Sequence, residues 1–525
     1  MRQFFKANWV LFLILALALF FRFWQITQLP AGLFPDEAAN GLDINSMRQG
    51  ELAPFYERGN GREALFFHFE WLSTAIFGVG VWQFHIVSAM FGFASVVATY
   101  FLAKRLFDKH TALLATFFMA ISSYAVTVSR TAFRANMVPL LSILTIYFLV
   151  KFFQTEDTKS KYWSAFWAGL FFALGFYTYT SFRMMLPLVI GFGALLFLAH
   201  RAHARQLFKT YAKYKAVFTS AFILGISWIA SYFIQHPQSF VGRAGHVSIF
   251  NKDLNNGDIL GTFIDVVQKT MLSFFTHGDL NWRHNVSGFP FLSPLISPLF
   301  ALALVIFTYS LFKFLKQVYE QKLEKQTVYQ ALVASWFWLM LVPEITTAEG
   351  IPHGLRLIGV IPPLFILTGY GAHWLWQKFP HHHTVKFEKA IFATVFFMTL
   401  FFYNFGLYFG IAANSPEYYK FFRGDLTLVS EHINQRNLKD RTYLALDKFW
   451  LQTVDYLTTP TNQAYTAVEP VDAYKTQMKK GDQMIFTQST LFDRIEFIKT
   501  HPNAKLVLQG YDHLGNIVAL IYEQQ

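Results

Sequence analysis

Two adjacent carboxylates, Asp36 and Glu37, stand a few residues beyond the first long apolar segment of the chain. Placing two acidic side chains at the edge of a hydrocarbon layer costs free energy unless water, a cation or a reacting group meets them. The pair therefore predicts the catalytic end of a membrane enzyme. The alternative is that both residues only begin a helix, since Pro-Asp-Glu is a common helix start.

Arginines at the predicted outer ends of apolar runs form a second group with chemical potential: Arg130, Arg134, Arg183 and Arg356. Arg130 and Arg134 are four residues apart, so on a helix they would share one face. A guanidinium donates hydrogen bonds in pairs and stays charged, which suits a phosphate. We predict that the four bind the phosphate of a donor, and the alternative is that they only reach from the helix ends to the membrane surface.

A third group concentrates polar side chains in one long loop, where they are predicted to contact a polar ligand. It comprises Asp279, Asn281, Trp282, Arg283 and His284, to which we add Arg62, Glu63 and His353. Imidazole and carboxylate are also ligands that zinc or manganese accept, and carboxylate suits magnesium. The identity of the metal is unknown, and its candidate ligands are Glu63, His277 and His284, with Asp279 and Glu37 as further candidates.

The composition indicates which kind of protein positions these groups. Of 525 residues, 54% are hydrophobic and only 14% are charged, which excludes an ordinary soluble protein. The absence of cysteine excludes disulfides and thiolate metal sites. The formal charge of +12 does not indicate a nucleic-acid partner, because lysine and arginine gather in short loops between apolar runs, as on the cytoplasmic side of a membrane protein.

Runs long enough to span a bilayer predict about eleven transmembrane helices. They lie near residues 8–27, 82–103, 111–129, 135–153, 162–180, 184–200, 216–234, 291–312, 328–346, 355–376 and 390–411. The segment 64–79 is short and interrupted by His68 and Glu70, so we expect an amphipathic helix on the outer surface. With the N-terminus inside, the basic loops then all fall on the cytoplasmic side.

The tail has a different, mixed polar composition. We expect a transmembrane domain over residues 1–411 and a small extracytoplasmic α/β domain over 412–525. A helical pattern covers 416–436, and strand-like runs lie at 443–446, 484–486, 505–508 and 517–522.

Several short motifs occur in the same order along the membrane part. They are Phe34-Pro35-Asp36-Glu37-Ala38, Gly61-Arg62-Glu63-Ala64-Leu65-Phe66, Ser129-Arg130-Thr131-Ala132-Phe133-Arg134, Tyr177-Thr178-Tyr179-Thr180, Asn281-Trp282-Arg283-His284-Asn285 and His353-Gly354-Leu355-Arg356. Together they resemble the GT-C glycosyltransferases, and more narrowly glycosyltransferase family 39 with its protein O-mannosyltransferase and lipid A aminoarabinose transferase relatives.

This resemblance implies an all-α polytopic GT-C fold and transfer of a hexose or pentose from a polyprenyl-phosphate carrier. The acceptor would be a glycan, lipid or protein at the outer face of the cytoplasmic membrane. Asp36 would take the acceptor proton opposite the leaving phosphate, with inversion, and Glu37 would orient the acceptor, Asp36 or a metal. The third group of polar side chains would contact sugar or acceptor.

The sequence leaves three alternative functions. A transporter would place its polar residues near mid-membrane on broken helices, often in two related halves, whereas here they lie at helix ends without a visible repeat. A transferase of another lipid headgroup of the cell envelope is the second alternative. A structural anchor for the tail is the third, and it accounts for neither the acidic pair nor the arginines.

Overall fold

The computed structural model describes residues 2–241, 244–378, 386–436, 441–462 and 464–525. Two compact units can be recognised within the chain. The helical unit comprises Met1–Trp24, Pro54–Phe66 and Ser88–Tyr408. The mixed unit comprises Gln25–Ala53, Phe67–Val87 and Phe409–Gln525, and so contains the acidic pair as well as the tail. The predicted domain boundary after residue 411 stays a prediction.

Membrane-spanning helices dominate the helical unit. Among the described residues, eight helices with their adjoining turns are long and apolar enough to cross a membrane. They are α4 (Trp82–Leu106), α7 (Met137–Gln154), α9 (Met185–Ala199), α10 (Ala204–Gln235), α15 (Ser297–Glu320), α16 (Lys325–Ile345), α17 (Ile361–Lys378) and α18 (Lys386–Phe405). The chain is therefore a multi-pass membrane protein.

A ninth span is broken in the middle. Helices α5 (Lys109–Ile121) and α6 (Ser123–Arg130) meet at an angle of 58°. The Ser122 hydroxyl accepts a hydrogen bond from the Ala125 N–H, so this residue ends one helix and begins the next. The expected segment 111–129 is thus two helices.

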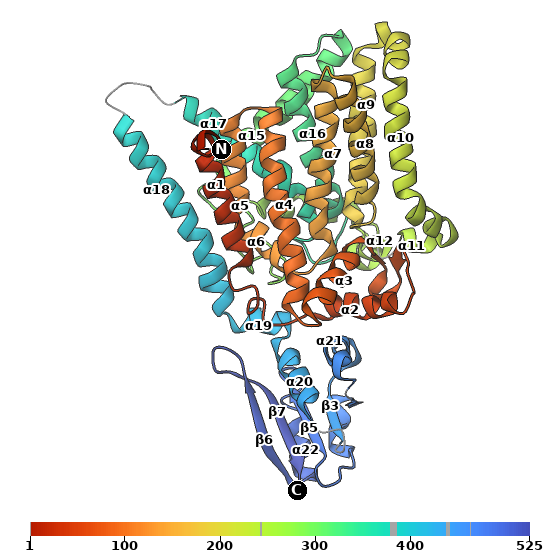
Figure 1. Cartoon of the computed structure of the whole chain (residues 1–525). Helices are drawn as coiled ribbons and strands as arrows, with labels where there is room; N and C mark the ends of the chain where they lie inside the picture. The colour runs from red at the N-terminus through yellow and green to blue at the C-terminus, as the bar shows by residue number, and fades with distance from the viewer. Residues whose placement is uncertain (1, 242–243, 379–385, 437–440, 463) are drawn as a thin grey trace. The chain divides into compact units, whose positions relative to one another are not determined.

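Two further helices correspond to the remaining predicted spans. They are α1 (Arg2–Phe23), whose apolar part is the shorter stretch Asn8–Phe23, and α8 (Thr158–Gly175). Helix α8 packs between α7 and α10, whereas α17 packs against α5, α15 and α16 (Figure 1). The unit also contains α14 (Ile259–Leu272) and the short helices α11 (Pro237–Val241), α12 (Ala244–Val247) and α13 (Lys252–Asn255).

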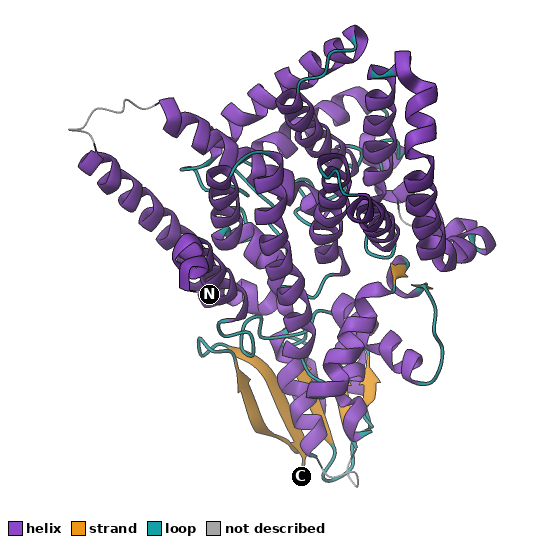
Figure 2. Ribbon diagram, turned by 45° about the horizontal axis from the view of Figure 1, so that its top comes forward, coloured by secondary structure: helices purple, strands orange, loops and turns teal. Residues whose placement is uncertain are grey.

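The tail forms a five-stranded sheet in the order β4-β3-β5-β7-β6, shown in orange in Figure 2. Its strands are β3 (Thr442–Ala445), β4 (Thr466–Val468), β5 (Gln483–Thr487), β6 (Ala504–Tyr511) and β7 (Ile517–Gln524). Strand β3 is parallel to β4 and β5, and β7 is antiparallel to β5 and β6. The four predicted strands are confirmed, and β4 is an additional one.

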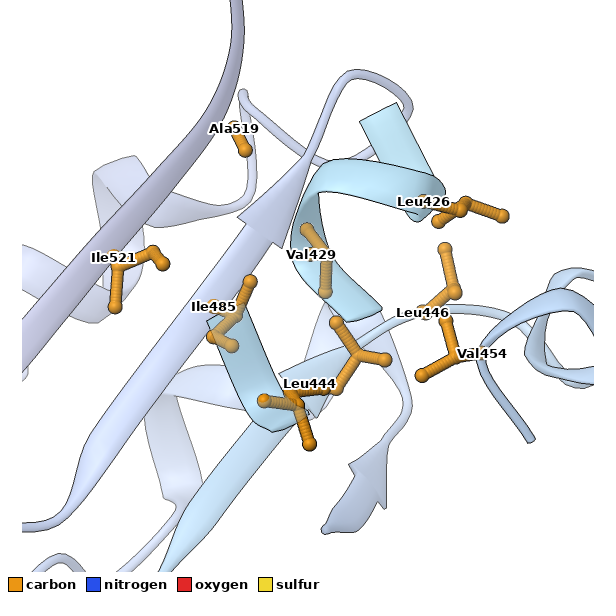
Figure 3. Packing of buried hydrophobic residues seen from close by; sticks show 9 residues of the cluster. Leu426, Val429, Leu444, Leu446, Val454, Ile485, Ala519 and Ile521 are labelled. Atoms are coloured by element: carbon orange, nitrogen blue, oxygen red, sulfur yellow. The ribbon is translucent and has the colours of Figure 1, made fainter. Parts of the chain in front are cut away.

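Helices cover both faces of this sheet because its strands alternate. Leu444 and Ile485 point to one face, where they pack with residues of α20 (Gly424–Gln435) and α21 (Lys448–Thr458), as Figure 3 shows. Tyr443 and Met484 point to the other face and pack with Phe497 of α22 (Arg494–Thr500). The tail is therefore an α/β fold with its own core, as expected.

The helix predicted over 416–436 is interrupted. It consists of α19 (Pro416–Phe422) and α20, separated by Arg423 with a positive φ of 57°. Two guanidinium nitrogens of Arg423 each lie 2.9 Å from a carboxylate oxygen of Asp425. This buried bidentate pair explains how a non-glycine residue is held in that conformation.

Candidate active site

Helix α2 (Pro35–Arg48), in the mixed unit, carries the acidic pair in its first turn. Oε2 of Glu37 accepts a hydrogen bond from the Phe34 N–H at 2.9 Å, and Oε1 lies 3.4 Å from Nε2 of His85. Glu37 is fully buried, whereas Asp36 is exposed. The two carboxylates therefore differ: Glu37 serves the start of the helix, and Asp36 is accessible to a reactant.

In the helical unit, a short hairpin supplies a further carboxylate, that of Glu63. Strand β2 (Arg62–Glu63) pairs with β1 (Phe55–Tyr56), and Nε of Arg134 lies 2.9 Å from Oε2 of Glu63. The Arg134 guanidinium also lies 5.4 Å from the ring centre of Tyr179. Arg62, the residue before Glu63 in the chain, is also buried, and its Nε donates a hydrogen bond to the Arg58 carbonyl.

Tyr179 is affected by the charges of this pair and by those of a second pair, Arg356 and Glu344. Burial raises the pKa of its hydroxyl, and the charges that act on it are those of Arg134, Arg356, Glu63 and Glu344. Nη1 of Arg356 lies 3.9 Å from Oε2 of Glu344 and donates to the Glu349 carbonyl at 2.6 Å. The charges of two arginines and two carboxylates thus act on one tyrosine.

The loop that follows α14 is folded by its own polar side chains. Oδ1 of Asp279 accepts from the Asn281 N–H at 2.7 Å, and Oδ1 of Asn281 accepts from the Arg283 N–H at 3.0 Å. Such turns are typical of Asp and Asn. They place Arg283 over the ring of Phe133, with 5.7 Å between guanidinium and ring centre, while the neighbouring Trp282 is half-buried.

Asp279 links this loop to the loop between α16 and α17. Its Oδ2 lies 2.8 Å from Nδ1 of His284 and accepts from the Gly354 N–H, also at 2.8 Å. The rings of His284 and His353 are 4.4 Å apart, and the His353 N–H donates to Oε1 of Glu344 at 2.7 Å. Sites far apart in the sequence therefore form one polar cluster.

Asp279, His284 and His353 form a group that fits a metal ion. One ligand atom from each lies within 4.8 Å of the others. Burial lowers the pKa of His284, and burial together with the nearby His284 holds the pKa of His353 well below its usual value. Both imidazoles are therefore neutral at pH 7, the form that coordinates a metal. Nδ1 of His353 is buried without a hydrogen-bond partner in the described part of the chain.

The predicted metal ligands are only partly in this group. His284 and Asp279 belong to it, but Glu63 is paired with Arg134 and His277 is exposed. The sequence prediction did not include His353 as a ligand, although it placed this residue in the sugar or acceptor site.

A second group that could hold a metal comprises Asp108, His110 and His373. It lies at the start of α5 and near the C-terminal end of α17. Oδ1 of Asp108 accepts from the backbone N–H groups of His110 and Thr111 at 2.8 and 3.0 Å. This carboxylate caps the start of α5.

Comparison with known proteins agrees with this architecture. The model of the family described as "Dolichyl-phosphate-mannose-protein mannosyltransferase" matches residues 64–229, which is about a third of the chain. No curated protein matches the chain in sequence.

Among solved structures, ArnT from Cupriavidus metallidurans bound to undecaprenyl phosphate is similar, with 11% identity and a TM-score of 0.57. The similarity covers 98% of each chain. The chain has the GT-C fold. The oligosaccharyltransferase AglB from Archaeoglobus fulgidus, in complex with an inhibitory peptide and a dolichol-phosphate, has 12% identity and a TM-score of 0.51. That similarity covers 99% of this chain and 75% of AglB.

Within this GT-C fold, the expectation that Arg130 and Arg134 share a helix face is wrong. Helix α6 ends at Arg130, and the extended backbone of Thr131 and Phe133 separates it from Arg134. Arg130 is fully buried, donates to the Phe21 carbonyl at 3.2 Å and lies over the Tyr408 ring. The two arginines therefore contact different partners.

Arg183 also contacts protein groups in the GT-C fold. Its Nη1 donates to the Phe240 carbonyl at 2.6 Å, and its guanidinium lies 4.1 Å from the centre of the Phe240 ring. The charge of Glu63 acts on it as well.

Sequence reasoning missed three members of these sites. Glu344 and His85 are fully buried polar residues within apolar helices, and Tyr179 lies between the charged pairs. A lone ionisable residue in an apolar segment is itself a sign of function, so Glu344 was detectable. Nothing in the sequence around Tyr179 indicates that two arginines approach it.

Proposed function

We propose that the chain is a membrane glycosyltransferase that moves a sugar from a polyprenyl-phosphate carrier to an acceptor. The observation that carries this proposal is the GT-C fold over the whole chain, shared with an ArnT bound to undecaprenyl phosphate. The match to a mannosyltransferase family model supports it. So does the cluster of arginines with carboxylates and neutral imidazoles, since a departing phosphate needs cations.

Asp36 is proposed as the base. Its exposed carboxylate would take the proton of the acceptor hydroxyl or amine while the acceptor atom bonds to the anomeric carbon. The bond from that carbon to the phosphate oxygen breaks on the opposite side, so the configuration inverts and polyprenyl phosphate leaves with the electron pair. Buried Glu37, joined to the Phe34 N–H, would position the first turn of α2.

The donor phosphate is proposed to bind arginines. Arg134 and Arg356 have the strongest support, because the charges of both act on Tyr179 and both side chains are partly exposed. Arg183 and Arg130 complete the proposed set. Guanidinium groups that are already held in place lose little orientational freedom when a phosphate binds, so the entropic cost of binding is small.

The remaining cluster residues are proposed to bind acceptor or sugar: Arg62, Glu63, Asp279, Asn281, Trp282, Arg283, His284 and His353. When present, a zinc, manganese or magnesium ion held by Asp279, His284 and His353 would add positive charge near the phosphate. Without it, the Asp279 carboxylate joins the two loops by contacting the His284 ring and the Gly354 N–H.

The proposed location is the cytoplasmic membrane, with the N-terminus inside and the domain 412–525 outside. The lysine- and arginine-rich connections between spans support this orientation.

A transfer assay tests the proposal. Purified protein in nanodiscs is offered radiolabelled polyprenyl-phosphate hexoses and pentoses, with a membrane extract as acceptor. Label in a new product with the wild type, but not with Asp36→Asn, is the expected result. Wild-type turnover by Asp36→Asn overturns the base, and no transfer from any donor overturns the enzyme.

A further inference from the structure

A pocket of about 830 Å³ opens at the opposite end of the helical unit from the polar cluster. It is formed where α4 and α7 end and α16 begins, and its charged lining residues are Lys104, Arg105 and Lys325. Lys325 and Glu344 are at opposite ends of α16, about 28 Å apart at 1.5 Å per residue. The pocket is therefore separate from the proposed active site.

The pocket has an uncompensated positive charge. Its described lining contains no carboxylate, and none of its three cations forms an ion pair with a described residue. The acidic residue next to Lys325 in the chain, Glu324, is paired with Lys313 at 2.6 Å. Three cations close together repel one another, so the pocket favours a bound anion.

Arg105 is held in place before any ligand binds. Its Nη1 donates to Oε1 of Gln154 at 2.9 Å, and Nε2 of Gln154 donates to the Arg105 carbonyl at 3.0 Å. The same amide donates to the Tyr329 hydroxyl at 2.6 Å, and the guanidinium lies 5.0 Å from the centre of the Tyr147 ring. An arginine fixed in this way can present its remaining N–H groups to a phosphate at little entropic cost.

The rim of the pocket is apolar. The side chains of Phe101 and Phe153 line it and are 51% and 61% exposed. Both lie near the ends of membrane-spanning helices, where aromatic side chains are typically enriched at the boundary between acyl chains and headgroups. A soluble anion would make no use of these rings, whereas a lipid places its phosphate in the pocket and its chains against them.

We propose that this pocket binds the phosphate headgroup of an anionic phospholipid from the leaflet at this end of the helices. Basic pockets between spans on the cytoplasmic side suit such headgroups. The lipid would join α4, α7 and α16 at the end remote from the polar cluster.

The test uses the full-length protein in nanodiscs of phosphatidylcholine with and without phosphatidylglycerol. Native mass spectrometry of the extracted protein counts retained lipid, and thermal unfolding reports its effect. The pocket variant is Lys104→Gln/Lys325→Gln, which keeps the Arg105–Gln154 pair. The control is Lys209→Gln/Lys322→Gln, which removes the same charge from exposed positions at the same end.

We expect phosphatidylglycerol to be retained and to raise the unfolding temperature of the wild type and the control. The pocket variant should bind it roughly tenfold or more weakly. If the wild type retains both lipids equally, or if the pocket variant and the control lose phosphatidylglycerol equally, the pocket is not the binding site. Equal stabilisation by inorganic phosphate without anionic lipid, unaffected by Phe101→Ser/Phe153→Ser, overturns a lipid as the ligand.

Discussion

Nε of Arg134 lies 2.9 Å from Oε2 of Glu63, joining the β1–β2 hairpin to the start of α7 across 71 positions of sequence. Only 2% of the Glu63 side chain and 20% of the Arg134 side chain are exposed. Because the pair is largely shielded from solvent, it fixes the hairpin and holds one guanidinium at the border of the polar cluster.

Breaking this pair should destabilise the fold. Glu63→Gln or Arg134→Gln alone is expected to lower the free energy of unfolding by about 1–3 kcal/mol, because each leaves a largely buried charge without its partner. Removing both should cost less than the sum of the two. Thermal unfolding of the wild type and the three variants measures the coupling, and strictly additive losses would contradict a direct interaction.

The two carboxylates of α2 should respond differently to neutralisation. Asp36→Asn is expected to lower turnover by about 10²–10⁴-fold with unchanged unfolding temperature, because the side chain is exposed. Glu37→Gln weakens the hydrogen bond to the Phe34 N–H and should lower stability by about 1 kcal/mol. Transfer assays and thermal unfolding of both variants separate catalysis from helix capping. Equal effects on both readouts in both variants would contradict this assignment.

A metal at the histidine cluster should depend on specific residues. After treatment with a chelator and incubation with zinc, we expect elemental analysis to find bound zinc in the wild type. His284→Gln and His353→Gln should lose it. The matched control is His277→Gln, since His277 is in the same loop but exposed and outside the group. Loss of zinc in both His277→Gln and His284→Gln, but not in His353→Gln, would instead support the ligand set expected from the sequence.

Arg134 and Arg356 should contribute more to carrier binding than Arg130. Arg134→Gln and Arg356→Gln are expected to weaken binding of undecaprenyl phosphate by about 10-fold or more, since each removes a charge-assisted hydrogen bond. Binding titrations at fixed temperature measure this. For Arg130→Gln, weaker binding at unchanged stability supports a phosphate contact. Lost stability with unchanged binding assigns Arg130 to its contacts with the Phe21 carbonyl and the Tyr408 ring.

Helix α2 should tolerate no added volume at Gly41. A Cβ there would lie 2.4 Å from the ring of Tyr456 in α21, so Gly41→Ala must push two packed helices apart. We expect a loss of about 1–3 kcal/mol in unfolding free energy. Gly191→Ala is the matched control, because nothing lies within 4 Å of its added Cβ. Similar unfolding temperatures for both variants would contradict tight packing at Gly41.

Local patterns in the sequence determined much of the fold. Apolar runs predicted every helix counted as a span, and alternation predicted β3, β5, β6 and β7, because both signals arise within a few consecutive residues. The same patterns could not show that Ser122 breaks a span or that Arg423 divides a helix. Those interruptions depend on single hydrogen bonds and ion pairs.

Sequence also named most members of the polar cluster, because His, Asp and Arg are conspicuous at the ends of apolar runs. Which of them meet was decided only by tertiary structure. Asp279 reaches the Gly354 N–H across 75 residues, which brings His353 rather than His277 to His284. Arg130 and Arg134 separate because an extended turn, and not a helix, follows α6. Contacts over such distances depend on how whole helices pack, and short sequence patterns carry no information about that packing.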